Sequence, residues 1–208
     1  MKRVFIILLA VWSLAGCIRR DYSKLPAVTE GHQVTMVVEI SAGTALKIEY
    51  DVASRRFVPD SIRGKARQIE FLPYPVNYGF IPSTLQSKQT GGDGDPLDVM
   101  MIGSYTPTGS VIKVIPVGVL RLLDNNEKDD KILVIPADPE KRLINADDFA
   151  TLSVNYPTIL SLLNDWFVNY KGSGITRSGG WGDESEAWQM IMACRVKDDN
   201  TKVGAPIQ

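Results

Sequence analysis

Two hydrophobic patterns follow one another along this chain, and their order restricts the fold more than any other feature. Runs rich in β-branched residues, typical of strands, occupy residues 34–43, 45–52, 111–123 and 131–138. From Pro157 onward the apolar residues recur every three or four positions, over 157–170 and again over 182–197, which predicts two helices. Strands followed by helices indicate an α+β domain, most simply a small β-barrel with the two C-terminal helices packed outside.

The first 16 residues have the layout of a secretory signal, with a basic start, "MKR", and the apolar run "VFIILLAVWSLAG". That run is shorter than the roughly 20 residues of a transmembrane helix. The ending "LAGC" resembles a bacterial lipobox, which implies cleavage before Cys17 and lipid on its sulfur. An ordinary signal peptide with an incidental cysteine, or an uncleaved anchor, is the alternative.

These features divide the chain into a lipoprotein signal peptide (1–16), a polar, irregular, lipidated tether (17–33) and one domain (34–208). They predict a protein outside the cytoplasm, anchored by lipid to a bacterial membrane. Ile18 follows the cysteine where an aspartate would favour inner-membrane retention, so the expected location is the periplasmic face or the outer membrane.

The remaining composition excludes several kinds of site. Cys194 is the only cysteine after Cys17, so the domain has no intramolecular disulfide. His32 is the only histidine, which disfavours a Ser-His-Asp triad and the common zinc sites. The 23 basic and 24 acidic residues form no basic patch with interleaved aromatics, so nucleic acid is not an expected partner.

Three aspartates crowd into "GGDGDPLDVM", namely Asp93, Asp95 and Asp98. Each raises the cost of ionising the others, so a positive partner is expected there. An EF-hand calcium loop does not fit, because its sixth position would be Asp98 instead of glycine and its twelfth would be Ser104 instead of glutamate. Clustered carboxylates of this kind suit hard cations such as Mg²⁺.

Other polar residues stand in or beside the strands and helices. Each alone has an ordinary structural interpretation as a hairpin loop, an outward-facing strand residue, a packed aromatic turn or a helix end. They are Glu39, Glu49, Tyr74, Tyr78, Asp124, Asp129, Lys131, Tyr170 and Lys171.

Their order is more specific than any one of them. The segments "KIEY", "YPVNYGFIP", "DGDPLDV", "GVLRLLDNNEKDDK" and "NYK" together resemble the family I soluble inorganic pyrophosphatases, over roughly residues 34–196. The pattern D-x-D-P-x-D-V is that family's signature. The resemblance implies a five-stranded, OB-like closed barrel, pyrophosphate as substrate, roughly three to four Mg²⁺ ions per active site and a homo-oligomer, either a dimer or a hexamer.

The resemblance also assigns roles to matching positions. The implied metal ligands are Asp93, Asp98 and Asp129, with Asp124 and Glu39 for the metals that arrive with substrate. Asp95 matches the carboxylate that accepts a proton from the attacking water. The implied phosphate-binding residues are Lys47, Arg67, Tyr78, Lys131, Tyr170 and Lys171. Tyr78 and Lys131 are also implied to be catalytic, together with Asp95, and Glu49 and Tyr74 line the cavity around Tyr78.

Two departures limit this transfer. The bacterial family usually has Asp-Glu where this chain has Asp124-Asn125, so one carboxylate becomes a neutral amide. The segment 59–71, "PDSIRGKARQIEF", is longer than the common bacterial version, which makes Arg67 the expected phosphate-binding arginine and Arg63 the alternative.

The expected chemistry is direct attack on pyrophosphate by water that Mg²⁺ activates, while lysines and an arginine stabilise the leaving phosphate. Two alternatives stay open at this point. One is hydrolysis of other phosphoanhydrides, such as short polyphosphate or nucleoside phosphates. The other is a non-catalytic lipoprotein that binds metal or phosphate, for which Asn125 is the one supporting feature.

Overall fold

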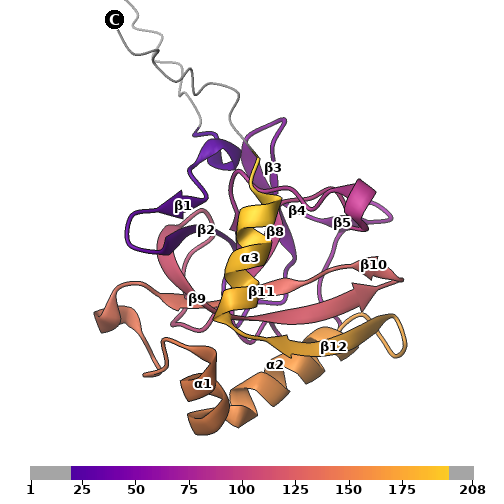
Figure 1. The fold of residues 1–208 in the computed structure, drawn as a ribbon. Helices are drawn as coiled ribbons and strands as arrows, with labels where there is room; N and C mark the ends of the chain where they lie inside the picture. The colour runs from indigo at the N-terminus through magenta and orange to yellow at the C-terminus, as the bar shows by residue number, and fades with distance from the viewer. Residues whose placement is uncertain (1–19, 197–208) are drawn as a thin grey trace, which may run out of the picture.

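A strongly curved β-sheet forms the centre of the molecule, with helices against its outer surface (Figure 1). The computed structural model describes residues 20–196, so the predicted signal peptide, Cys17 and the last residues of the predicted domain lie outside it. Eight strands make up the sheet. They are β1 (Val28–Thr29), β2 (Gln33–Ile40), β7 (Asn77–Ile81), β8 (Leu97–Met101), β9 (Val111–Asp124), β10 (Glu127–Lys128), β11 (Lys131–Pro136) and β12 (Thr176–Gly182).

Five of these strands pair in a circuit. β2 pairs with β7, β7 with β8, β8 with β11, β11 with β9, and β9 again with β2. Only the β8–β11 pairing of this circuit is parallel. The family resemblance implied five strands, whereas β1, β10 and β12 extend the sheet beyond that number. These three were missed because β1 and β10 have two residues each and β12, "TRSGGWG", has no apolar alternation.

Proline interrupts the longest strand without ending it. Pro116 lies inside β9 opposite Val134, and the pairing of β9 with β11 shifts register between Leu133 and Val134. A bulge is therefore present at this proline, which cannot donate to the sheet ladder. Pro136 is the last residue of β11.

The described residues contain three α-helices where the sequence predicted two. They are α1 (Phe149–Asn155), α2 (Pro157–Asn169) and α3 (Glu184–Cys194). The missed helix, α1, has only seven residues and begins where Asp148 accepts a hydrogen bond from the Thr151 amide at 2.6 Å. Asp183 caps α3 in the same way through the Glu186 amide. None of the helices within residues 20–196 has the length and apolar character needed to cross a membrane.

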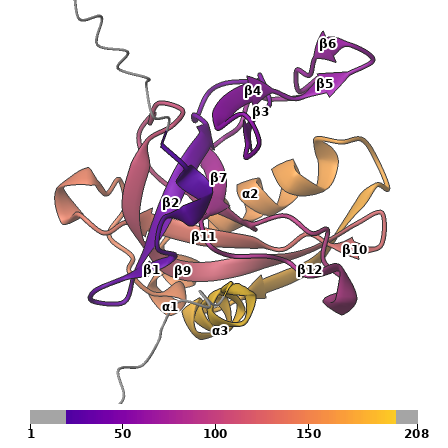
Figure 2. The same ribbon diagram turned by 90° about the horizontal axis from the view of Figure 1, so that it is seen from above.

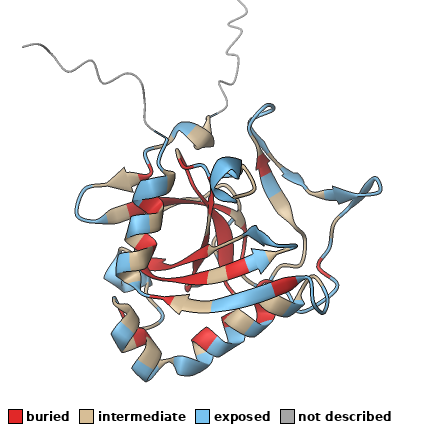
Figure 3. Cartoon of the chain, turned by 45° about the vertical axis from the view of Figure 1, so that its right-hand side comes forward, coloured by how far each residue is buried: buried red, intermediate tan, exposed pale blue. Residues whose placement is uncertain are grey.

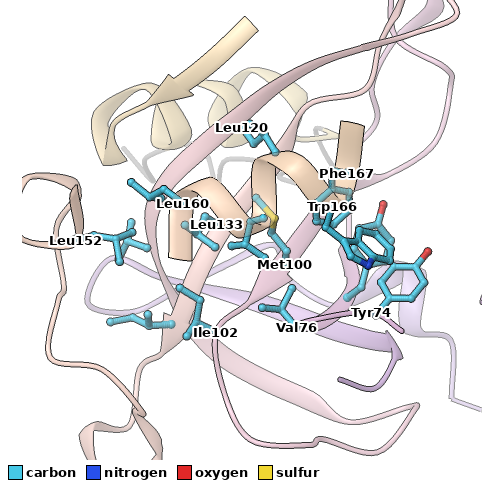
Figure 4. Close-up of a cluster of buried hydrophobic side chains, with 14 of the residues drawn as sticks. Tyr74, Val76, Met100, Ile102, Leu120, Leu133, Leu152, Leu160, Trp166 and Phe167 are labelled. Atoms are coloured by element: carbon cyan, nitrogen blue, oxygen red, sulfur yellow. The ribbon is translucent and has the colours of Figure 1, made fainter. Parts of the chain in front are cut away.

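The apolar interior lies between the curved sheet and its helices (Figure 3). One cluster joins α2 to strands β7, β8, β9 and β11, and Figure 4 shows Trp166 and Phe167 of α2 beside Tyr74. A second cluster lies under α3, where Ala187 and Ile191 are fully buried. Trp166, Phe167 and Tyr74 lie at the edge of the first cluster, next to polar residues. The cluster therefore forms one wall of the functional site that is described below.

Two hairpins project from the sheet as an arm (Figure 2). The first pairs β3 (Ile48–Asp51) with β4 (Arg56–Pro59), and the second pairs β5 (Ser61–Ile62) with β6 (Lys65–Ala66). The second hairpin lies within the segment 59–71. Its residues are exposed, so its position is set by its connections to Asp60 and Arg67 at its base.

The segment that precedes β2 is more ordered than the irregular tether predicted for residues 17–33. A single 3₁₀ turn forms at Tyr22–Lys24, and β1 pairs with β2. The Tyr22 ring lies 5.4 Å from Tyr50 and 5.1 Å from Phe57, centroid to centroid. Aromatic packing of this kind attaches the described part of the segment to the β3–β4 hairpin.

Candidate active site

A polar cavity of about 170 Å³ opens at the mouth of the curved sheet, between the β3–β4 hairpin and the C-terminal end of α2. Except for Arg67, every site residue that the sequence predicted within the described part of the chain lines it. These residues are Glu39, Lys47, Glu49, Tyr74, Tyr78, Asp93, Asp95, Asp98, Asp124, Asp129, Lys131, Tyr170 and Lys171. Cys17, the predicted lipidation site, lies outside the described residues.

The parallel pairing of β8 with β11 creates the centre of this cavity. Asp98 of β8 and Lys131 of β11 are direct register partners. The Lys131 ammonium donates to a carboxylate oxygen of Asp98 and, at 2.5 Å, to Oδ1 of Asp129. Lys131 is only 2% exposed, so its charge depends on these two carboxylates. Burial opposes the charge of Lys131, but Asp98 and Asp129 outweigh it and raise the pKa of the ammonium.

A second lysine connects the end of β9 to the end of α2. The Lys171 ammonium donates to Oδ2 of Asp124 at 2.5 Å and lies 3.9 Å from Asp129. Burial lowers the pKa of Lys171 and the neighbouring Tyr170, Asp124 and Asp129 raise it, with a net increase. The Tyr170 ring stacks on Trp166 at 4.6 Å with an interplanar angle of 8°, which holds this end of α2 against the cavity.

The loop before β8 presents the remaining aspartates. Oδ1 of Asp93 accepts the Asp95 amide at 2.9 Å, a local turn that Gly94 permits with φ of 93°. Burial, followed by the charges of Asp93 and Asp98, raises the pKa of the Asp95 carboxyl. A carboxylate with a raised pKa is a better proton acceptor, so the loop favours Asp95 as a general base.

Glu39 closes the cavity on the side of β2. Its Oε1 accepts the Tyr50 amide at 2.7 Å, which joins β2 to the β3–β4 hairpin. Burial raises the pKa of Glu39 to about 8, with smaller contributions from Asp98 and Glu49, while the Tyr50 hydrogen bond acts in the opposite direction. A cation beside Glu39 would relieve this cost of ionisation.

Two tyrosines from the segment "YPVNYGFIP" form the wall shared with the apolar core. The Tyr74 and Tyr78 rings lie 5.4 Å apart, and Tyr74 also packs 4.6 Å from Trp166. Burial raises the pKa of both phenols, so both are neutral hydrogen-bond donors over the physiological range. The Lys131 ammonium lies 5.8 Å from the centroid of the Tyr78 ring.

Arg67 lies at the edge of the site and lines an adjoining cavity. Its guanidinium donates to Oδ2 of Asp60 at 3.1 Å, and the same oxygen is 3.6 Å from the Lys47 ammonium. Asp60 therefore couples the two cations, a role that no motif in the sequence indicated. Arg63, the alternative to Arg67, is exposed in the β5–β6 turn and lines neither cavity.

Comparison with known proteins identifies the family. The family model for inorganic pyrophosphatase matches residues 36–198. A curated inorganic pyrophosphatase from Synechocystis is 32% identical over 179 residues, which cover 84% of this chain and 96% of the relative. The chain belongs to the inorganic pyrophosphatase family. It is an inorganic diphosphatase, an enzyme that hydrolyses pyrophosphate.

Solved structures of this family share its fold. Inorganic pyrophosphatase from Thermus thermophilus matches with a TM-score of 0.69 and 28% identity, covering 84% of this chain and 97% of that one. The type I inorganic pyrophosphatase from Toxoplasma gondii matches with a TM-score of 0.74 and 26% identity, covering 82% and 83% respectively. The mixed α+β architecture with a β-sheet core and three helices is therefore that of the inorganic pyrophosphatases.

In this member of the family, lysines lie between the acidic side chains. Within residues 20–196, no three acidic, histidine or cysteine side chains are close enough together to surround a metal ion as they stand. Asp98 and Asp129 pair with the Lys131 ammonium, and Asp124 pairs with the Lys171 ammonium.

Proposed function

We propose that the chain hydrolyses inorganic pyrophosphate to two phosphates in an Mg²⁺-dependent reaction, by direct attack of water. The observation that carries this proposal is the convergence of carboxylates, lysines and neutral tyrosines on one cavity. Carboxylates suit metal ions and lysines suit phosphate oxygens, so the site is equipped for both halves of a metal–pyrophosphate complex.

The donor set fits a hard divalent cation. Asp93, Asp98 and Asp129 offer only carboxylate oxygens, which are the ligands that Mg²⁺ prefers. Asp124 and Glu39 face the same cavity from β9 and β2 and would hold the ions that accompany substrate. The chemistry that bound Mg²⁺ supplies is neutralisation of substrate charge and a lower pKa for water. Roughly three to four such ions per site are part of this proposal.

The protein's own residues supply binding and proton transfer. Lys47, Lys131 and Lys171 bring three cations to the cavity and bind phosphate oxygens, and Arg67, at the edge of the site, adds a fourth. Asp95 takes the proton of the attacking water, in line with its raised pKa. Tyr78, as a neutral phenol, and Tyr170 donate hydrogen bonds to the same anion, because donors placed in advance at a developing charge lower the barrier.

Phosphate release by the full-length chain tests the reaction. We expect rapid release from pyrophosphate with Mg²⁺, none with EDTA, and a loss of at least about a hundredfold for Asp95→Asn. Glu140→Gln, an exposed carboxylate outside the cavity, serves as the matched control and keeps full activity. A folded, Mg²⁺-binding protein that releases no phosphate would contradict hydrolysis and favour a binding role.

We further propose that the enzyme is a lipoprotein, with lipid on Cys17 and a location on the periplasmic face or in the outer membrane of a bacterium. The lipobox "LAGC" after an apolar run supports this proposal. Radiolabelled palmitate should enter the wild-type chain and not Cys17→Ala in a bacterial host. Equal labelling of the two, or none in either, would contradict it.

Two structural proposals accompany the function. The five-strand pairing circuit supports a small closed barrel of the OB type. A homo-oligomer, either a dimer or a hexamer, follows from the resemblance to family I enzymes. Light scattering at several protein concentrations would show the mass, and a monomer throughout would contradict the oligomer.

A further inference from the structure

A second cavity adjoins the catalytic one. It has a volume of about 900 Å³ and lies between the β5–β6 hairpin, the β9–β10 turn and the residues that follow α2. Tyr170 and Lys171 line both cavities, so the two spaces share a wall. Apart from Arg67, Tyr170 and Lys171, the residues that line the larger cavity have no role in the reaction described above.

The polar groups of the second cavity suit an anion. Lys65, Arg67 and Lys171 line it with positive charge, against a single carboxylate, Glu70. Asp60 and Asp124 already accept from Arg67 and Lys171, respectively. In the described part of the chain, no carboxylate lies within ion-pair distance of Lys65, whose ammonium is therefore free to bind an anion.

Two segments far apart in the sequence face each other across this cavity. The segment 59–71 supplies its outer wall, including Lys65 and Arg67. Asn125 lines the opposite side with a neutral amide. The cations of the first segment therefore face no carboxylate at position 125.

The turn between β9 and β10 also favours asparagine at position 125, and this turn allows two substitutions that test the cavity. Asn125 and Asn126 have φ of 49° and 72° and form the two-residue turn between β9 and β10. Turns with two positive φ angles favour asparagine, aspartate and glycine. Aspartate can therefore add a charge at position 125 and glycine can remove the side chain, without loss of the turn.

We propose that the second cavity binds the additional phosphate of a linear polyphosphate, so that the enzyme also hydrolyses tripolyphosphate. This inference rests on the proposed function, because the same catalytic cavity holds the bond that breaks. Oxygen from water joins the terminal phosphorus, the bridging P–O bond breaks, and pyrophosphate leaves. Asp95 takes one proton of the water, and the second remains on the phosphate product. The pyrophosphate is then hydrolysed as the ordinary substrate.

Steady-state kinetics on the full-length chain tests this proposal, with pyrophosphate and tripolyphosphate as parallel substrates in Mg²⁺. Lys65→Ala should raise the KM for tripolyphosphate by about three- to fivefold, the range expected for one exposed ion pair, and leave that for pyrophosphate within twofold. Asn125→Asp should raise the tripolyphosphate KM in the same way, whereas Asn125→Gly should not. Lys113→Ala, which removes an exposed strand lysine beside a different cavity, is the control.

The outcomes separate this inference from the proposed function. Selective loss with tripolyphosphate in Lys65→Ala and Asn125→Asp supports the extended site. Hydrolysis of pyrophosphate without hydrolysis of tripolyphosphate would overturn the inference and leave the pyrophosphatase intact. Equal effects of the variants on both substrates would also overturn it. Failure to hydrolyse pyrophosphate would contradict the proposed function itself.

Discussion

Replacement of Lys131 by methionine tests whether this lysine and a metal ion serve the same carboxylates. Lys131 is buried between Asp98 and Asp129, whose side chains are 21% and 16% exposed. Removing one partner of a fully buried pair costs about 3–5 kcal/mol. Because these carboxylates keep some contact with water, we expect the lower end, about 3 kcal/mol, in the metal-free protein.

Such a loss lowers the melting temperature by about 6–12 °C for a domain of this size. Mg²⁺ should reduce the difference in melting temperature between Lys131→Met and the wild type. The cation can neutralise the two carboxylates that have lost their lysine partner. Activity should remain low, because the phosphate-binding ammonium is absent.

Differential scanning fluorimetry with EDTA and with Mg²⁺, beside phosphate release, measures both effects. Lys113→Met replaces an exposed lysine of β9 and should change neither property. A stability difference that is the same with and without Mg²⁺ would refute the reasoning, because it would assign the loss to packing instead of charge.

Three further predictions concern pH and packing. Folding raises the pKa of Glu39 from 4.5 to about 8, so metal-free protein should lose about 1–2 kcal/mol of stability as the pH rises from about 5 to about 8, after allowance for partial exposure. Glu39→Gln should flatten this dependence in urea titrations, and an unchanged slope would contradict it. Gly79→Ala would place its Cβ 1.9 Å from the Val37 carbonyl oxygen, so we expect a loss of about 3 kcal/mol or more; a melting temperature near wild type would contradict this. Leu163→Ala empties a fully buried position in α2 and should cost about 3 kcal/mol by urea unfolding, with a cost below about 1 kcal/mol counting against it.

The sequence predicted the elements that have a strong period of their own. The helix α2 begins at Pro157 as its apolar spacing indicated, and β9 and β11 lie where the β-branched runs do. The strand β12 could not be recognised, because three of its seven residues are glycines and its position depends on pairing with β9. The two hairpins of the arm could not be predicted from a local hydrophobic pattern either, because their strands are short and mostly exposed.

The functional site, like the fold, could be predicted from the sequence only in part. The spacing of Asp93, Asp95 and Asp98 pointed to a cation before any fold was known, and the cavity brings all three together. The contact between Asp98 and Lys131 required the parallel register of β8 and β11, which no single segment encodes. The role of Asp60 was hidden for a similar reason, because its partner Lys47 belongs to a different strand region and Arg67 follows a hairpin.

The pairing circuit has a consequence for how the enzyme acquires activity during folding. Residues of the cavity are drawn from β2 to the end of α2, and the seam between β2 and β9 joins segments far apart in the chain. Contacts of high sequence separation form slowly, since loop entropy is lost before they form. A nascent chain that ends before Tyr170 and Lys171 therefore lacks part of its phosphate-binding set, and catalysis can begin only after nearly the whole domain has been synthesised.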